Sequence, residues 1–313
     1  MKIINIADFK SLELSDLEIE SNDLRWIDIT RPIELLPPFI EKTIHGRHRG
    51  DLSNSSHPPF FEQTESYELL IVRTIDERFI FHEPKTRSCA FIIYGNTIIT
   101  VHDNDASTFK SVYQRWLNKE QKKPREIISL LHSLLDEIGK EFLSLREPLA
   151  AQISEWQQKL LDPNDPFNDW QIIMQAKSRL RGLTTNLELQ RDVLSSWKQN
   201  TLYELTPSHI IRFNDLDNHL ARIERLSTGL GADLESLTQI YFASTGQRTN
   251  VTVQILAVIS AIFLPLNLIA GIFGMNFETI PLLKHEWGAA FAIGIMLVIS
   301  VALLWWFKKK KWY

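Results

Sequence analysis

Several polar side chains lie in a stretch of the chain that is otherwise suited to hydrocarbon. Residues 249–277 contain no charged side chain, yet they include Asn250, Ser260, Asn267 and Asn276. At about 1.5 Å per residue, a helix of this length exceeds a hydrocarbon core of about 30 Å, so the stretch predicts a membrane span. Polar groups that face lipid are costly, and we therefore expect these side chains to face protein or water.

Positions spaced three and four residues apart on this helix form one stripe. The stripe consists of Asn250, Val253, Ala257, Ser260, Leu264, Asn267, Gly271 and Gly274. Two interpretations are open, a small-residue face that packs against another helix and the lining of a pore. Because two helices cannot enclose a pore, the second interpretation requires several copies of the chain around this stripe.

A second apolar run follows at residues 287–307. It contains no charged residue, ends with Trp305 and Trp306, and is followed by the lysines Lys308–Lys311. Lysines at the end of a span favour the cytoplasmic side, and tryptophans favour the interface. Two spans return the N-terminal part to the same side as the C-terminus, so only residues 277–286 are expected outside.

The rest of the chain has the composition of a soluble, acidic domain. Of the 34 basic and 38 acidic residues, six basic and two acidic ones lie from Arg248 onward, which leaves a net charge of −8 on the first 247 residues. This charge argues against nucleic acid as a partner. The N-terminus lacks the features of a signal peptide, and the single cysteine, Cys89, excludes an intrachain disulfide framework. Without a phosphate-binding loop, a nucleophile elbow or an HExxH motif, we expect no enzyme.

The first 105 residues favour strands. The segments 25–30, 67–76, 78–83 and 89–103 are rich in β-branched and aromatic residues. Within the last one, Gly95-Asn96 between FIIY and TIITV predicts a hairpin. Residues 45–60 are polar and predict a loop. Its three histidines suggest a metal site only weakly, because their spacing does not match a zinc cluster; they are His45, His48 and His57.

Helical periodicity dominates the chain after Asp105. Residues 107–120, 125–161 and 170–198 predict three helices, and residues 208–274 predict one very long helix that contains Pro265. The expected fold is an α+β cytoplasmic domain with a small, mainly antiparallel sheet, joined by a very long stalk helix to a two-helix transmembrane domain. The expected boundaries are 1–123 for the α/β domain, 124–206 for a helical hairpin, 207–248 for the stalk, 249–274 for the first span, 275–286 for the external loop, 287–307 for the second span and 308–313 for the basic tail.

The motif Gly274-Met275-Asn276 after an apolar span resembles the CorA family of divalent-cation channels. The likeness extends to residues 241–250 (YFASTGQRTN), 263–278 (FLPLNLIAGIFGMNFE) and 307–313 (FKKKKWY). It implies a funnel-shaped homopentamer in the bacterial cytoplasmic (inner) membrane, with five first spans around a pore, the lipid bilayer around five second spans, and both termini in the cytoplasm. The implied cargo is Mg²⁺ or Co²⁺.

Two alternatives remain open. A ZntB-like zinc transporter is the nearest one, although the intact GMNFE sequence favours Mg²⁺ over Zn²⁺. A two-span sensor or anchor belongs to another class of protein. That alternative would predict a first span without the polar residues seen here and an output domain with catalytic motifs.

The resemblance also implies roles for particular residues. Gly274, Met275 and Asn276 would form the selectivity filter at the outer mouth, where amide oxygens contact a hydrated cation. Within the membrane, the pore-lining residues would be Asn250, Val253, Leu256, Ser260 and Asn267. Val253 and Leu256 would form a hydrophobic constriction, and Asn267 replaces the threonine that is usual in the family.

The resemblance also implies roles for charged residues outside the membrane. Glu278 and Glu286 would attract cations in the external loop, where the family's second acid after the loop proline is absent because Leu282 and Leu283 follow Pro281. Asp215 matches an acidic position that binds a regulatory Mg²⁺ between subunits. The candidates for its partner carboxylate are Asp76, Asp103 and Asp105.

Overall fold

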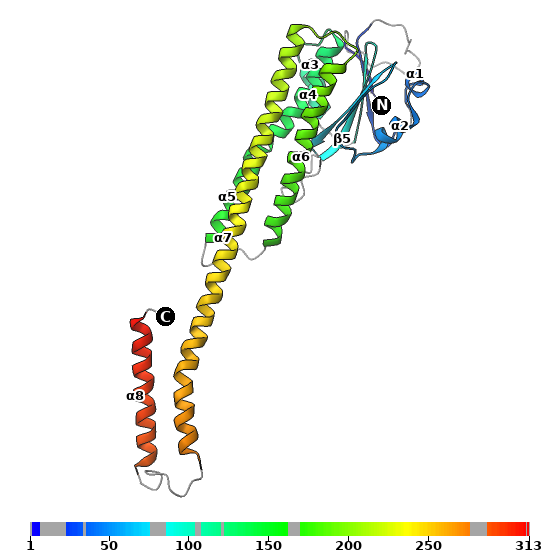
Figure 1. Ribbon diagram of the computed structural model, residues 1–313. Coiled ribbons are helices and arrows are strands. Elements are labelled where there is room, and N and C mark those ends of the chain that lie inside the picture. Colours follow the sequence, from blue (N-terminus) through cyan, green and yellow to red (C-terminus); the bar gives the residue numbers. More distant parts are fainter. Residues whose placement is uncertain are drawn as a thin grey trace. The chain divides into compact units, whose positions relative to one another are not determined.

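The computed structural model describes residues 2–6, 23–33, 36–75, 86–103, 108–119, 122–161, 170–275, 287–310 and 312. The chain divides into two compact units, Met1–Thr238 and Gln239–Tyr313. Figure 1 shows the helices and strands of both, and each unit is described by itself below.

The first unit is built on one mixed sheet. Its described strands are β1 (Lys2–Asn5), β2 (Arg25–Thr30), β3 (Phe60–Gln63), β4 (Glu68–Ile75), β5 (Thr86–Tyr94) and β6 (Thr97–His102). They lie in the order β1-β2-β6-β5-β4-β3, and all neighbours are antiparallel except β2 and β6. The mainly antiparallel sheet is therefore confirmed, and the parallel pair is an addition that the sequence did not indicate.

The hairpin at Gly95-Asn96 is confirmed. Tyr94 pairs with Thr97 across the turn between β5 and β6. Gly95 has a φ of +53°, in the left-handed region that glycine enters without steric cost. The turn residue thus fixes the register of the two central strands, because a slip by one residue would turn every side chain to the other face.

Short helices cover one face of the sheet, α1 (Pro38–Glu41) and α2 (Gly46–Ser53). Ile40 and Leu52 from these helices are fully buried, and they belong to the same apolar cluster as Ile99 and Val101 of β6. The expectation of a loop over residues 45–60 is therefore wrong for residues 46–53. Two buried residues, His48 and Leu52, attach this otherwise polar helix to the rest of the unit.

The opposite face carries aromatic residues and a pair of helices, α3 (Thr108–Leu117) and α4 (Ile127–Ser144). Trp26 of β2 makes edge-to-face contacts with Phe109 and Trp116 of α3, each at a centroid distance of 5.9 Å. Its indole Nε1 donates to Thr100 Oγ1 at 3.0 Å, so the buried polar atom is satisfied. The sheet is therefore the middle of three layers.

Long helices complete the first unit, α5 (Arg146–Leu161), α6 (Trp170–Asn200) and the first part of α7 (Pro207–Phe273). The single helix expected over residues 125–161 is divided at Leu145, between α4 and α5. Phe213 of α7 packs on Trp197 of α6 at 4.7 Å between ring centroids. Arg191 of α6 donates to Asp217 and Glu224 of α7, so an ion-pair clamp adds to the apolar contact.

The second unit contains the last part of α7 and helix α8 (Gly288–Lys309). Figure 1 shows α8 alongside the end of α7. Both helices are long and apolar enough to cross a membrane, and only 6% of the apolar window of α7 and 11% of that of α8 is buried. A core helix of a soluble domain would be mostly buried, so these two helices are suited to lipid or to contacts with further chains.

Candidate functional site

The stripe on α7 is exposed along its whole length. All eight of its positions from Asn250 to Gly274 are exposed in the second unit. The buried or half-buried positions, such as Val258, Pro265 and Ile269, lie on the other side of the helix. On α8, Gly288, Ala292 and Phe307 are buried at helical spacing. The intrachain contacts of α7 thus leave the polar stripe free.

Two carboxamides on this stripe have no partner. Within the described residues, the side chains of Asn250 and Asn267 make no hydrogen bond. Leaving an amide in an apolar medium without a hydrogen bond costs roughly 2–7 kcal/mol. Ser260 differs, because its Oγ donates to the Leu256 carbonyl at 2.9 Å and so satisfies its hydrogen within the helix. The two asparagines therefore require water or a neighbouring chain.

The predicted constriction residues are large and exposed. Val253 is 59% exposed and Leu256 is 63% exposed. Isobutyl and isopropyl groups on a helix that faces its own copies can form an apolar ring, and such a ring can stop ions by dewetting. The exposure meets the first requirement for that role.

Gly274 stands where the chain leaves α7. Its N–H donates to the Ala270 carbonyl at 2.8 Å. A Cβ at this position would lie 3.0 Å from the same oxygen, so a larger residue would require the backbone there to move by a few tenths of an ångström. The next residue, Met275, is 50% exposed. Asn276, Glu278 and Glu286 lie outside the described residues, so their predicted roles stay predictions.

Asp215 lies on the exposed side of α7 in the first unit. Among the described residues, its carboxylate makes no hydrogen bond or ion pair. Asp217, two residues later, is bound to Arg191 at 2.9 Å. A free carboxylate next to a neutralised one is the acid of this segment that a cation can reach.

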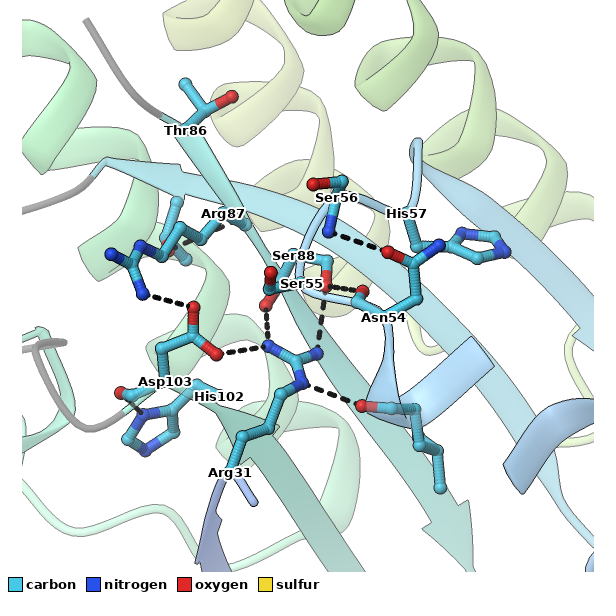
Figure 2. Close-up of polar contacts among 12 residues, drawn as sticks. Arg31, Asn54, Ser55, Ser56, His57, Thr86, Arg87, Ser88, His102 and Asp103 are labelled. Atoms are coloured by element: carbon cyan, nitrogen blue, oxygen red, sulfur yellow. Dashed lines mark hydrogen bonds and ion pairs between the residues drawn. The ribbon is translucent and has the colours of Figure 1, made fainter. Parts of the chain in front are cut away.

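Asp103 is unsuited to be the partner of Asp215. Its Oδ1 accepts from Arg31 Nη1 at 3.1 Å, and its Oδ2 accepts from Arg87 Nη1 at 2.6 Å (Figure 2). Burial acts to raise the pKa of Asp103, but the hydrogen bonds from Arg87 and Arg31 outweigh it and hold that pKa below its ordinary value. Both carboxylate oxygens are therefore occupied by structural contacts within the first unit. The other two candidates, Asp76 and Asp105, lie outside the described residues.

The cluster around Asp103 is held by polar contacts from distant segments. Arg31 also donates to the carbonyl oxygens of Leu52 and Ser88, at 2.7 and 2.8 Å (Figure 2). Nearby, Arg73 is 7% exposed and donates to the carbonyl oxygens of Ser55 and His57. Burial and the neighbouring Arg31 lower the pKa of Arg73 to about 10. Sequence reasoning missed this cluster because its members come from separate strands and loops, with no local pattern.

The histidines of residues 45–60 serve structural contacts. His48 is buried, and its Nδ1 lies 2.7 Å from the Tyr67 hydroxyl. His57 Nε2 lies 3.4 Å from Asp51 Oδ1. No group of three or more His, Cys, Asp or Glu side chains that could hold a metal occurs in the part of the chain that the structure describes.

These features define a membrane protein with two C-terminal transmembrane helices and a mixed α+β domain before them. Residues 21–309 match the family model described as "CorA-like Mg2+ transporter protein". The chain belongs to this family, whose members are transporters and not enzymes.

Individual relatives agree with the family assignment. The chain is 26% identical to the cobalt/magnesium transport protein CorA of Thermotoga maritima, over 98% of this chain and 90% of that protein. It is 25% identical to the protein of the same description from Methanocaldococcus jannaschii, over 96% of this chain and 95% of that one. Both matches span nearly the whole chain, so the relatives contain both units.

Solved structures share the fold. The complete structure of the CorA magnesium transporter from Methanocaldococcus jannaschii has a TM-score of 0.83 at 23% identity, covering 100% of this chain and 98% of that one. The ZntB cytoplasmic domain from Vibrio parahaemolyticus has a TM-score of 0.62 at 14% identity, covering 79% of this chain and 98% of that domain. The first match confirms the expected combination of α+β domain, long helix and two apolar C-terminal helices.

Proposed function

We propose that the protein is a homopentameric channel for hydrated divalent cations, with Mg²⁺ as its main cargo and Co²⁺ as a second one. The observation that carries this proposal is the continuous exposure of the stripe, with Asn250 and Asn267 unpartnered on it. A ring of such carboxamides around an axis offers oxygens to the water shell of a cation without stripping it. That suits Mg²⁺, which dehydrates reluctantly.

The pentameric ring would place the α8-facing side of α7 away from the axis. This arrangement satisfies the polar stripe with water and leaves the apolar sides for lipid and for the neighbouring copies. At the outer mouth, Gly274, Met275 and Asn276 would select the cation, and Glu278 and Glu286 would raise its local concentration. The relatives named for cobalt and magnesium transport support the choice of cargo.

Ion flux into liposomes tests the cargo. Purified protein should carry Mg²⁺ and Co²⁺ faster than Zn²⁺, with Ni²⁺ as a fourth ion in the same assay. Asn276→Ala should lower Mg²⁺ flux at least about tenfold. A tenfold change corresponds to a loss of about 1.4 kcal/mol in the free energy with which the filter stabilises the passing cation. The variant should also fail to restore growth of a bacterium that lacks Mg²⁺ transport. Preferred flux of Zn²⁺ would favour the ZntB-like alternative, and wild-type Mg²⁺ flux by the variant would contradict the filter assignment.

Asp215 is proposed to hold a regulatory Mg²⁺ between neighbouring copies, with a second ligand from the adjoining subunit. Occupied sites would hold the ring shut, and their loss would leave repelling acids and loosen it. The unpaired, exposed carboxylate of Asp215 supports this role. The commitment of Asp103 to two arginines means that the second ligand must be another group.

Limited proteolysis tests the regulatory site. Millimolar Mg²⁺ should slow cleavage of the wild-type protein, and Asp215→Ala should abolish that protection. Asp233→Ala is the matched control, because Asp233 is also an exposed acid on α7. If Asp215→Ala keeps the full Mg²⁺ protection, the site lies elsewhere.

A further inference from the structure

Arg191 of α6 holds two carboxylates of α7 at once. Its Nε and Nη2 donate to the two oxygens of Asp217, at 2.9 and 3.3 Å, and its Nη1 donates to Glu224 Oε2 at 2.7 Å. The two acids are seven residues apart in the sequence, so they lie on one face of α7 and about 10 Å apart along its axis. Their hydrogen bonds raise the pKa of Arg191 above its ordinary value, so the guanidinium stays charged. We call Arg191, Asp217 and Glu224 the Arg191 clamp.

The guanidinium, and not burial, keeps these two acids occupied. The side chain of Asp217 is 32% exposed and that of Glu224 is 22% exposed, so water and ions can approach both. Among the described residues, neither carboxylate has a partner other than Arg191. Asp215, on the exposed side of the same segment, is not bound by the clamp. Arg191 thus determines how many of these three acids are open to a cation.

The space that the guanidinium fills matches a hydrated divalent cation. Asp217 Oδ1 and Glu224 Oε2 contact the same planar group, so these oxygens lie at most about 8 Å apart. Mg²⁺ holds its water at about 2.1 Å, and a water donates to a carboxylate at about 2.7 Å, so the hydrated ion reaches such an oxygen at about 5 Å. One hydrated ion can therefore contact both carboxylates once the guanidinium is removed.

Apolar contacts hold this part of α7 independently of the clamp. A Cβ on Gly139 of α4 would lie 3.3 Å from Leu216 Cδ1, so the two helices approach closely at this glycine. Phe213 packs on Trp197 of α6 with 4.7 Å between the ring centroids. Loss of Arg191 should therefore change the charge of the segment more than its position.

We propose that Arg191 sets the cation sensitivity of α7. Its guanidinium is a built-in cation that occupies Asp217 and Glu224, so a divalent ion acts on this segment through Asp215 alone. A site with fewer free carboxylates needs a higher cation concentration to fill, and the clamp thereby keeps the threshold for regulation high. Arg191 is a positioning residue, because it acts through the acids that it binds. The effect on regulation rests on the proposed role of Asp215, whereas the occupation of the two acids does not.

Counting bound Mn²⁺ on the full-length protein in detergent tests the clamp. Mn²⁺ prefers the same oxygen ligands as Mg²⁺, and the electron paramagnetic resonance signal of the free ion reports how much is bound. We expect Arg191→Gln to bind about one further Mn²⁺ per chain, because two carboxylates become free together. The triple variant Arg191→Gln, Asp217→Asn, Glu224→Gln should return to the wild-type number.

Limited proteolysis measures the threshold for regulation. The Mg²⁺ concentration that gives half of the full protection should fall at least about fivefold in Arg191→Gln, the low end of the range for coupled sites. An unchanged concentration would overturn the claim on sensitivity. Adding Asp215→Ala separates the two proposals. Full Mg²⁺ protection of Asp215→Ala contradicts the regulatory role of Asp215, whereas a further Mn²⁺ bound by the Asp215→Ala, Arg191→Gln protein, relative to Asp215→Ala, supports the clamp.

Matched controls separate the clamp from charge loss and from misfolding. Arg191→Lys keeps the positive charge between the two acids. Lys177→Gln removes another ion pair between α6 and α7 and frees only Glu235, whose side chain is 49% exposed. Both variants should bind the wild-type number of Mn²⁺. Arg191→Met keeps an apolar stem and should repeat the result of Arg191→Gln should the latter fold poorly. A wild-type number of Mn²⁺ in Arg191→Gln and Arg191→Met would overturn the proposal, as would a further Mn²⁺ retained by the triple variant.

Discussion

His102, at the end of β6, is a buried histidine whose two ring nitrogens both face acceptors. Nδ1 lies 2.7 Å from the Asp103 carbonyl oxygen, and Nε2 lies 2.8 Å from Asp28 Oδ1. Only the doubly protonated imidazolium can donate to both. Burial acts to lower the pKa of His102, but the hydrogen bond and charge of Asp28 outweigh it, with a smaller opposing effect from Arg31, and raise that pKa above 6.5.

This geometry predicts a pH-dependent contribution to stability. A histidine with a raised folded-state pKa stabilises the fold fully below its unfolded pKa of about 6.5, and this contribution is lost as pH rises through the folded-state pKa. His102→Asn should therefore destabilise the protein more at pH 6 than at pH 9, by about 1–3 kcal/mol at the lower pH. Thermal midpoints of the full-length protein measure this, with the exposed His219→Asn as control. Equal destabilisation at both pH values would contradict the claim that His102 is doubly protonated in the folded protein.

Residues with a local signature could be predicted, and those defined by distant contacts could not. Gly95 and the asparagines of the stripe follow from turn chemistry and helical periodicity. The neutralisation of Asp103 depends on Arg31, which lies 72 positions away in the sequence. Asp103 was a candidate partner of Asp215 because no residue near it in the sequence indicates that two arginines bind it.

At the scale of elements, Glu68 attaches the end of α6 to the sheet. It is fully buried at the start of β4. Its carboxylate accepts from Trp197 Nε1 and from Thr201 Oγ1, each at 2.8 Å, and from the backbone N–H of Leu202. Tyr203, in the same connection, donates its hydroxyl to the Gly95 carbonyl at 2.8 Å. The link between α6 and α7 is thus fixed to β4 and to the turn between β5 and β6.

Removing this carboxylate should loosen the connection. Glu68→Ala leaves a buried indole N–H, a hydroxyl and a backbone N–H without their acceptor, and each unmet donor costs about 1–3 kcal/mol. We expect a loss of at least about 3 kcal/mol in the free energy of unfolding, with earlier proteolytic cleavage between α6 and α7. Glu65→Ala is the control, because Glu65 is an exposed acid three residues before β4. Similar stability of the two variants would show that the carboxylate is dispensable.

Long periodic elements were predictable, and the short or polar ones were not. The very long helix was expected over residues 208–274, and α7 spans Pro207–Phe273 despite Pro265. Helix α2 was missed, because only Leu52 and His48 are buried on an otherwise polar segment. The break at Leu145 was missed as well, since the apolar spacing of α4 continues into α5. Strand pairing between β2 and β6 depends on the fold as a whole, so no segment taken alone indicates it.

At the scale of the whole molecule, the two units contain different parts of the proposed channel. The first unit contains the buried polar links and the free Asp215, and the second contains the two spans and the polar stripe. Helix α7 contains both Asp215 and most of the stripe. The central claim is that this stripe faces a water-filled axis formed by several copies of the chain.

Thiol modification at adjacent positions tests that claim most directly. Burial raises the pKa of the native Cys89 thiol well above its ordinary value, so Cys89 should not react. Ser260 lies on the stripe, whereas Ile259 is 47% exposed on another face of the same helix. Ser260→Cys and Ile259→Cys are treated in liposomes at low Mg²⁺ with a charged, membrane-impermeant thiol reagent, and Mg²⁺ flux is then measured. The proposed pore predicts at least about a tenfold loss of flux for Ser260→Cys and unchanged flux for Ile259→Cys. Unchanged flux for Ser260→Cys, or an equal loss for both variants, would contradict it.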